Sequence, residues 1–109
     1  MKKKNILFVC SLNWHRSKTA ETLFSKFDQL NVKSAGIKKY AQTPITKELI
    51  DWSDTVFVME EKHKTYITEK FIDSKKEDNI IILDIEDKYN YMDPKLIHIL
   101  EEKIISHIK

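Results

Sequence analysis

The residues that could do chemistry together are Cys10, the only cysteine of the chain, and Arg16, its only arginine. Five residues separate them, and the remaining strongly basic side chains are all lysines. A cysteine thiolate is a strong nucleophile. A guanidinium presents planar, paired donors that match the oxygens of a phosphate, which a lysine ammonium does not. The Cys-x5-Arg spacing therefore indicates a sulfur nucleophile that attacks a bound oxyanion.

The segments on either side would place this pair well. Residues 5–10 form an apolar run rich in branched side chains, which is typical of a strand buried on both faces. A helix is expected over 17–30, because apolar residues recur there at three- and four-residue spacing: Ala20, Leu23, Phe24 and Phe27. A loop at a helix N-terminus turns backbone N–H groups toward an anion, and the helix dipole favours an anion or a thiolate at that end.

The rest of the chain alternates apolar runs with helical patterns. Further strands are expected over 32–35, 55–59 and 80–83, and a charged turn over 75–78. Helices are expected to begin at the cap-like pairs Thr43-Pro44 and Asp93-Pro94, and another carries the apolar stripe Tyr66, Ile67 and Phe71.

This alternation predicts one α/β domain over 1–109, with a parallel sheet covered by helices on both faces. In such folds ligands bind beyond the carboxyl ends of the strands, where Cys10 would lie.

Composition argues against several functional classes. The chain has 109 residues, 41% of them hydrophobic, which suits one compact core. Its lysines are scattered and its formal charge is only +2, so no nucleic-acid partner is expected. The apolar run after the N-terminal lysines is too short for a signal peptide, and no run approaches the roughly 20 apolar residues that cross a bilayer. We therefore expect a cytoplasmic protein that does not bind membranes. The sequence also offers no cluster of metal-ligating residues, so no metal ion or other cofactor is expected.

The sequence around the pair resembles a known signature. The stretch VCSLNWHRS, from Val9 to Ser17, is similar to the phosphate-binding loop of the low-molecular-weight protein tyrosine phosphatases. Segment 34–36 resembles the family's Ser-Ala-Gly after the second strand, segment 58–59 the end of its third strand, and segment 85–89 its Asp-Pro-Tyr loop. The resemblance implies a flavodoxin-like fold with a four-stranded parallel sheet. It also implies hydrolysis of phosphomonoesters, phosphotyrosine in proteins among them, through a phosphocysteine and without a metal.

Carried over by position, the resemblance implies that Cys10 is the nucleophile, Arg16 the phosphate clamp and Asp87 the general acid. Asp87 would protonate the leaving oxygen and then activate the water that hydrolyses the phosphocysteine.

The remaining roles are also implied by the resemblance. Ser17 would donate a hydrogen bond to the thiolate, and Asn13 with Ser34 would hold the shape of the loop. The residues implied to contact the substrate are Ser11, Leu12, Asn13, Trp14, His15, Ser17, Ser34 and Tyr89. The expected partner is a phosphorylated protein or a small phosphomonoester, and the expected oligomeric state is a monomer.

The chain departs from the family's pattern at several positions. Leu12 replaces a glycine of the loop, His15 replaces a second cysteine, and Lys88 and Asn90 replace a proline and a tyrosine beside the general acid. The segment between Gly36 and the third strand is also short. In the family, that segment helps to shape the substrate cleft.

Several residues have a second interpretation. Cys10 could be a small buried apolar residue, and Asp84 could act as the general acid, although its place at a strand end is typical of a turn. Trp14 could form a wall for an aromatic leaving group or pack on the sheet edge, and Tyr89 and Tyr91 could line the cleft or cover the core. The other histidines, expected on the helix surfaces, are His63, His98 and His107.

Three other functions fit part of the pattern. A phosphocarrier subunit of a sugar phosphotransferase system also carries a phosphorylated cysteine after its first strand, but it lacks the arginine and needs no acid. Arsenate reduction uses further cysteines, so Cys10 would need an external thiol. A non-catalytic phosphate-binding module would not need the Cys10 and Arg16 pair.

Overall fold

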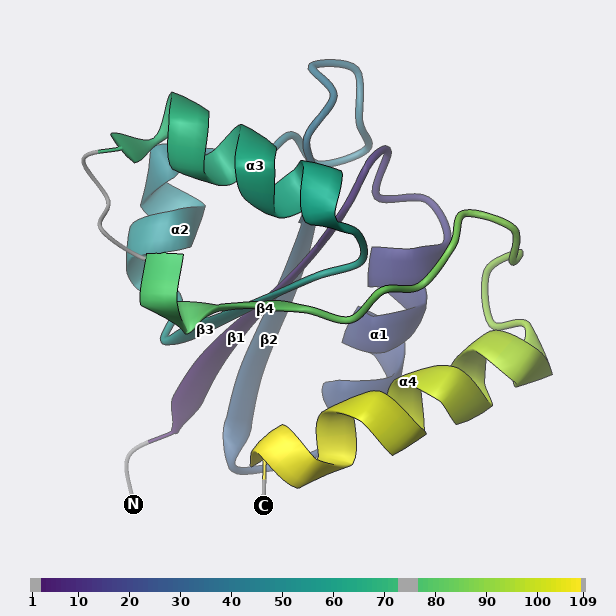
Figure 1. Ribbon diagram of the computed structural model, residues 1–109. Helices are drawn as coiled ribbons and strands as arrows, with labels where there is room; N and C mark the ends of the chain where they lie inside the picture. The colour runs from purple at the N-terminus through teal and green to yellow at the C-terminus, as the bar shows by residue number, and fades with distance from the viewer. Residues whose placement is uncertain (1–2, 73–76, 109) are drawn as a thin grey trace.

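The computed structural model describes residues 3–72 and 77–108 (Figure 1). Parallel strands form one sheet in the order β2-β1-β3-β4: β1 Lys4–Cys10, β2 Leu30–Gly36, β3 Thr55–Val58 and β4 Ile80–Ile82. The α-helices are α1 Arg16–Phe24, α2 Lys47–Trp52, α3 Glu61–Lys70 and α4 Pro94–Ile108. The prediction of a four-stranded parallel α/β fold is therefore confirmed.

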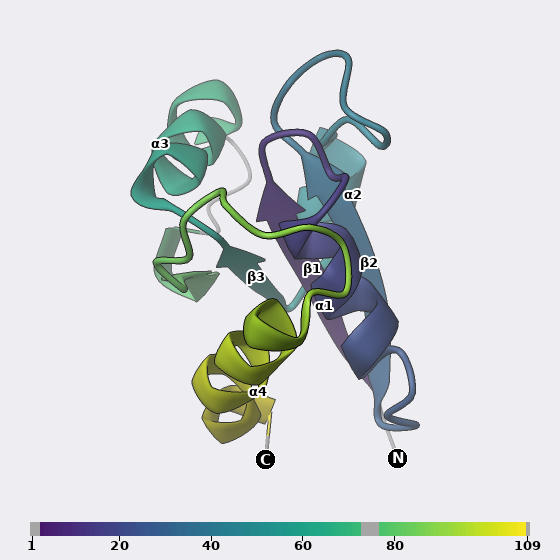
Figure 2. The same ribbon diagram turned by 90° about the vertical axis from the view of Figure 1, so that its right-hand side faces the viewer.

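Side chains of β1 alternate between two separate cores. Ile6, Phe8 and Cys10 face the layer of α1 and α4, whereas Leu7 and Val9 face the layer of α2 and α3. Figures 1 and 2 show the sheet between these two helix layers. Each of these five residues is at most 3% exposed, which explains why the strand has no alternation of polar and apolar residues.

The order of the strands in the sheet determines where Cys10 lies relative to the strand ends. Since β1 lies between β2 and β3, the chain crosses to one side of β1 and later continues on the other. Cys10, at the carboxyl end of β1, pairs with Gly36 at the end of β2. In open parallel sheets such a change of direction leaves a crevice beyond the strand ends. The fold therefore places Cys10 where a ligand can bind.

Helix α1 is shorter than the sequence pattern predicts. The expected helix over 17–30 ends at Phe24, where the Ser25 N–H donates to the Glu21 carbonyl. Phe27 packs on Phe24 at 5.7 Å between ring centroids, so its apolar spacing reflects a turn folded against the core. Leu30 already belongs to β2, where it pairs with Lys4 of β1.

Helix α2 also begins later than expected. Its N-cap is Thr46, whose hydroxyl accepts the Leu49 N–H at 3.2 Å, so the prediction of a cap at Thr43-Pro44 is wrong. Gly36 binds the chain on both sides of Pro44, because its N–H donates to the Thr43 carbonyl and its carbonyl accepts the Ile45 N–H. These bonds hold residues 43–45 extended along the end of β2.

The other elements agree with the sequence pattern to within a residue or two. β3 and β4 each end one residue earlier than expected, and α4 begins after Asp93, whose carboxylate accepts the Lys95 N–H. Of the predicted charged turn, residues 75 and 76 lie outside the described residues, and Asp78 lies in the 3₁₀ helix Glu77–Asn79. None of the described helices is both long and apolar enough to span a membrane.

Candidate active site

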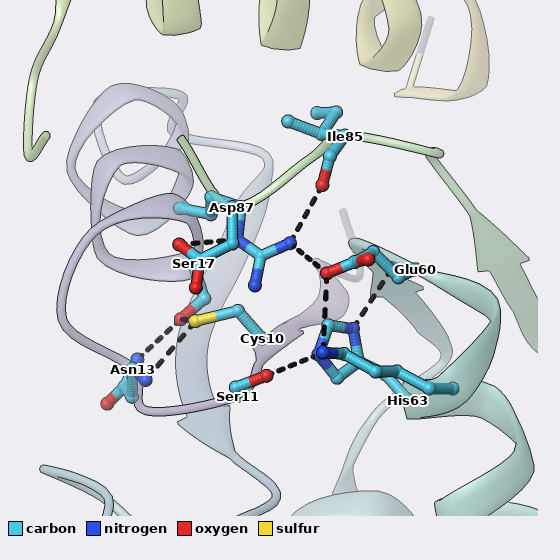
Figure 3. A network of polar contacts seen from close by, with 10 residues as sticks. Cys10, Ser11, Asn13, Ser17, Glu60, His63, Ile85 and Asp87 are labelled. Carbon is cyan, nitrogen blue, oxygen red and sulfur yellow. Dashed lines mark hydrogen bonds and ion pairs between the residues drawn. The ribbon is translucent and has the colours of Figure 1, made fainter. Parts of the chain in front are cut away.

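The Cys10 sulfur lies at the centre of a polar loop between β1 and α1 (Figure 3). Its Sγ atom accepts the Asn13 backbone N–H at 3.2 Å and lies 3.0 Å from the Ser17 hydroxyl. The Asn13 side-chain amide donates to that same hydroxyl oxygen at 2.7 Å. The Ser17 hydrogen is thereby left to point at the sulfur. The expected bond between Ser17 and the thiolate has the required geometry, and two donors converge on Sγ.

The loop turns at Asn13 rather than at the position of the missing glycine. Asn13 has a φ of 61°, in the left-handed region that asparagine tolerates better than most residues. Leu12 does not have a positive φ, so the chain forms this loop without a glycine. The replacement of that glycine by Leu12 is therefore compatible with an anion-binding loop.

A second segment, residues 37–42 after β2, fixes the direction of the loop's peptide groups. The carbonyls of Cys10, Ser11 and Leu12 accept hydrogen bonds of 3.0–3.1 Å, and their donors are the backbone N–H groups of Ile37, Lys38 and Gln42. In a peptide unit the carbonyl and the N–H point in opposite directions. Holding three consecutive carbonyls outward therefore turns the N–H groups of residues 11–13 inward, as the bond from Asn13 to Sγ shows.

Gly36 allows this second segment to approach so closely. A Cβ atom at Gly36 would lie 2.6 Å from the Ser11 carbonyl oxygen and 2.7 Å from the Ala41 Cβ. Neither distance is a possible van der Waals contact, so only glycine fits between the two segments. The chain's only glycine is thus required by packing behind the site.

Arg16 is 2% exposed, and its guanidinium is held on one side by protein groups. Nη1 donates to the Glu60 carboxylate at 2.6 Å and to the Ile85 carbonyl at 2.7 Å. Nε lies 3.8 Å from the Asp87 carboxylate, too far for a hydrogen bond. Within residues 3–72 and 77–108, Nη2 makes no hydrogen bond. The edge formed by Nε and Nη2 can therefore offer two parallel donors to an oxyanion.

Glu60 supplies the negative charge that balances Arg16. Burial raises the pKa of Glu60, but the hydrogen bond and charge of Arg16, together with the charge of Lys62, outweigh it and hold the pKa below its ordinary value. Glu60 therefore stays ionised near neutral pH and keeps Arg16 in place.

The pocket brings together most of the residues that the sequence singles out. It has a volume of about 310 Å³ and is lined by Cys10, Leu12, Trp14, His15, Arg16 and Asp87. Asp87 is 60% exposed, whereas Asp84 does not line the pocket and has a φ of 59°, typical of a turn. Of the two interpretations of Trp14, the pocket wall agrees with the structure: its side chain is 53% exposed and lines the pocket.

Three residues expected at the site lie elsewhere or face away from the pocket. Ser34 donates to the Glu21 carboxylate at 2.6 Å, so the expected pairing with Asn13 is absent from the hydrogen bonds of the described residues. Tyr89 is half-buried against the core beside α4 and does not line the pocket. Ser11 turns its hydroxyl toward α3 (Figure 3). Of the three, only Ser11 belongs to the loop, and its hydroxyl contacts His63 rather than the pocket.

No protein-family model matches the sequence, and no curated relative is similar to it. Solved structures do match over nearly the full chain. A low-molecular-weight protein tyrosine phosphatase from T. tengcongensis is 20% identical with a TM-score of 0.71, and the match covers 97% of this chain and 100% of that one. The chain has the low-molecular-weight protein tyrosine phosphatase fold.

Two further neighbours of this fold have phosphatase activities. The tyrosine phosphatase Wzb from Escherichia coli K30, solved in complex with phosphate, is 20% identical with a TM-score of 0.77, and the match covers 96% of both chains. The YwlE arginine phosphatase from Geobacillus stearothermophilus is 24% identical with a TM-score of 0.67, covering 95% of this chain and 94% of that one. The fold is shared, whereas these two neighbours act on different phosphorylated residues.

Sequence reasoning missed His63. The expectation that His63 lies on the surface is wrong, because it is fully buried, whereas His98 and His107 are exposed. Its Nδ1 accepts the Glu60 N–H at 3.0 Å and its Nε2 lies 3.0 Å from the Ser11 hydroxyl. Burial, and then the charge of Arg16, lower the pKa of His63 to about 4. A usable signal was present, since Glu60 and His63 directly follow a buried parallel strand, at the sheet edge where ligands bind.

Proposed function

We propose that this protein is a phosphomonoester hydrolase that acts through a phosphocysteine on Cys10. One observation carries the proposal: the Cys10 sulfur accepts an amide N–H, faces a hydroxyl and lines the same pocket as Arg16 and Asp87. A nucleophile, a bidentate cation and a carboxylic acid are the three groups that hydrolysis through a cysteine requires.

In the first step the Cys10 thiolate attacks phosphorus and the bond to the leaving oxygen breaks. Arg16 and the inward N–H groups of Ser11 and Leu12 stabilise the equatorial oxygens, while the Asn13 N–H donates to the sulfur. Asp87, at the rim of the pocket, gives its proton to the leaving oxygen.

In the second step Asp87 takes a proton from water, the water oxygen bonds to phosphorus and the S–P bond breaks. Inorganic phosphate leaves and the thiolate is restored, with the Ser17 hydroxyl donating to it.

The pocket walls favour an aromatic substrate. Leu12 and the exposed Trp14 are apolar surfaces beside Cys10, and an aromatic ring stacks well against an indole. A phosphotyrosine in a protein is therefore the proposed substrate, with small aryl phosphates as simpler ones. Phosphoarginine is the natural comparison, because one neighbour of this fold is an arginine phosphatase. We further propose that residues 1–109 act as one domain and as a cytoplasmic monomer.

No observation favours the alternative functions. A phosphocarrier needs no acid, yet Asp87 lines the pocket, and Arg16 is buried six residues after the cysteine. Arsenate reduction would still depend on an external thiol, since Cys10 is the only cysteine.

A comparison of substrates tests the proposal. We expect the protein to hydrolyse para-nitrophenyl phosphate and phosphotyrosine peptides, with a higher kcat/KM for phosphotyrosine than for phosphoarginine peptides. Cys10→Ser should lose turnover and still bind inorganic phosphate, because Arg16 and the loop amides remain. Turnover that persists in Cys10→Ser would remove Cys10 as the nucleophile. A preference for phosphoarginine would keep the mechanism and change the substrate.

A further inference from the structure

The N-terminus of α3 contacts the anion-binding loop through two side chains of its first turn, Glu60 and His63. Glu60, the N-cap of α3, binds Arg16 at the far end of the loop, and His63, three residues later, binds Ser11 at its near end. Figure 3 shows both contacts, on the side of Cys10 where Ser11 faces α3. The N-terminal end of α3 therefore contacts the loop at two places, at Ser11 beside the nucleophile Cys10 and at Arg16.

The hydrogen bonds of His63 define which nitrogen carries the proton. Nδ1 accepts the Glu60 backbone N–H, so in the neutral ring the proton must be on Nε2. Nε2 then donates to the Ser11 oxygen 3.0 Å away. The pKa of about 4 keeps this neutral form at physiological pH. The ring thus joins the cap of α3 to Ser11 by one accepted and one donated bond.

Ser11 is held in the loop by hydrogen bonds at both its backbone and its side chain. Its carbonyl is held by the Lys38 N–H, and its side chain is held by His63, so both are fixed on the outside of the loop. Its own N–H and that of Leu12 belong to the set that faces inward toward an anion. A rotation of the peptide groups around Ser11 would turn these donors away from the oxygens they are meant to bind.

We propose that His63 is a positioning residue of the anion site, which acts by holding Ser11 so that the neighbouring backbone N–H groups point at the bound phosphate. The proposal rests on the proposed function for its link to catalysis, but not for its link to phosphate binding. His63 does not line the pocket, and the proposed effect passes through its hydrogen bond with Ser11.

Two amide variants separate this role from that of a helix cap. In His63→Asn the side-chain oxygen reaches the place of Nδ1 and can still accept the Glu60 N–H, but the chain is too short to reach Ser11. In His63→Gln the amide nitrogen reaches the place of Nε2 and can donate to Ser11, while the bond to Glu60 is lost. His63→Asn therefore keeps only the hydrogen bond with Glu60, and His63→Gln keeps only the one with Ser11.

The experiment measures binding of inorganic phosphate by calorimetry in a Cys10→Ser background, and kcat/KM for para-nitrophenyl phosphate in the active protein. We expect His63→Asn to bind phosphate about 5–10-fold more weakly, the worth of one neutral hydrogen bond, and His63→Gln to recover much of that loss. Ser11→Ala removes the same bond from the other side. It should weaken binding similarly and add little to His63→Asn in the double variant.

Opposite or additive results overturn the proposal. If His63→Asn binds phosphate normally while His63→Gln does not, His63 is only a cap of α3. If Ser11→Ala and His63→Asn act additively, they do not act through a shared bond. Thermal unfolding of each variant shows whether a loss follows from unfolding, and Ser11→Ala still tests the bond if His63→Asn does not fold. Failure of the proposed function is distinct, because it appears as absent hydrolysis by the unsubstituted protein, whatever the variants bind.

Discussion

The two sides of the pocket are built in opposite ways. On one side, the anion-binding residues Cys10 and Arg16 are buried, and the loop that carries them is held from behind by backbone bonds, by Glu60 and by His63. On the other side, Asp87 is 60% exposed, and its contact with Arg16 is 3.8 Å long. Groups that hold charge in a transition state work best when they are fixed beforehand, whereas a proton donor must reach both solvent and the leaving group.

This contrast makes a prediction for each side of the pocket. Changes in the buried loop should affect phosphate binding and every substrate alike. Changes at Asp87 should leave phosphate binding intact and depend on the leaving group.

The largest expected effect is on the exposed side. Asp87→Asn should slow hydrolysis of phosphotyrosine or an alkyl phosphate by about 10²–10⁴-fold, the usual worth of positioned proton transfer. Para-nitrophenyl phosphate should be slowed less, because its leaving group needs the proton less. The measurement is kcat for a series of leaving groups, with phosphate affinity measured in parallel.

Asp84→Asn is the matched control, since Asp84 lies three residues away in the same loop and does not line the pocket. It should leave the dependence on leaving group unchanged. If Asp84→Asn shows the leaving-group dependence and Asp87→Asn does not, the acid lies three residues upstream. If neither does, this loop does not supply the acid.

On the buried side, Arg16→Lys should reduce kcat/KM by about 10²–10³-fold for all substrates, because one ammonium cannot replace two parallel donors. Phosphate binding should weaken as well, which distinguishes this variant from Asp87→Asn. Lys26→Arg, the reverse exchange at an exposed site, is the control and should leave kcat/KM unchanged. Near-normal kcat/KM in Arg16→Lys would contradict the clamp.

The burial of His63 should make stability depend on pH. Above about pH 6.5 the ring is neutral in both the folded and the unfolded chain. As the pH falls from 6.5 to 4, the unfolded chain binds a proton that the folded one excludes, so the free energy of unfolding decreases, by about 3 kcal/mol in total.

Urea unfolding at pH 7 and pH 4.5 measures this loss. Carboxyl groups also bind protons as the pH falls, so the comparison must be with His63→Gln, which lacks the imidazole. The decrease should be smaller in His63→Gln than in the unsubstituted protein. Equal decreases in both would mean that His63 does not have a lowered pKa.

The smallest expected effect tests the packing behind the loop. Gly36→Ala would place a Cβ atom 2.6 Å from the Ser11 carbonyl oxygen, and overpacking of this kind costs about 1–3 kcal/mol. Stability and phosphate affinity should both decrease. Adding Ala41→Gly removes the side-chain clash but not the backbone one, so the double variant should recover only in part. Full recovery would show that the contact with Ser11 does not matter.

Local patterns were enough to predict the sheet, and to predict that Cys10 and Arg16 lie at the two ends of one loop between a strand and a helix. The apolar run before Cys10 and the spacing to Arg16 lie within one strand, one loop and one helix turn, so neighbouring residues determine them. The predicted end of the first helix was wrong because of a contact distant in sequence. The spacing of Leu30 suits a helix, but Leu30 pairs with Lys4 on β1.

The supporting residues could not be predicted in the same way. Glu60 lies 44 residues from its partner Arg16, and His63 lies 52 residues from Ser11. Their meeting depends on β3 lying beside β1, which the order of the strands along the chain does not state. Such contacts become visible only when the order of strands in the sheet is known.

The central claim is that Cys10 carries the phosphoryl group during turnover, and mass spectrometry of the acid-quenched protein tests it most directly. During hydrolysis of para-nitrophenyl phosphate, the peptide that contains Cys10 should gain the mass of one phosphoryl group, and this species should disappear when the substrate is exhausted. Cys10→Ser under the same conditions should release no para-nitrophenol. Hydrolysis that continues while Cys10 is unmodified, or that proceeds at the normal rate in Cys10→Ser, would contradict the account.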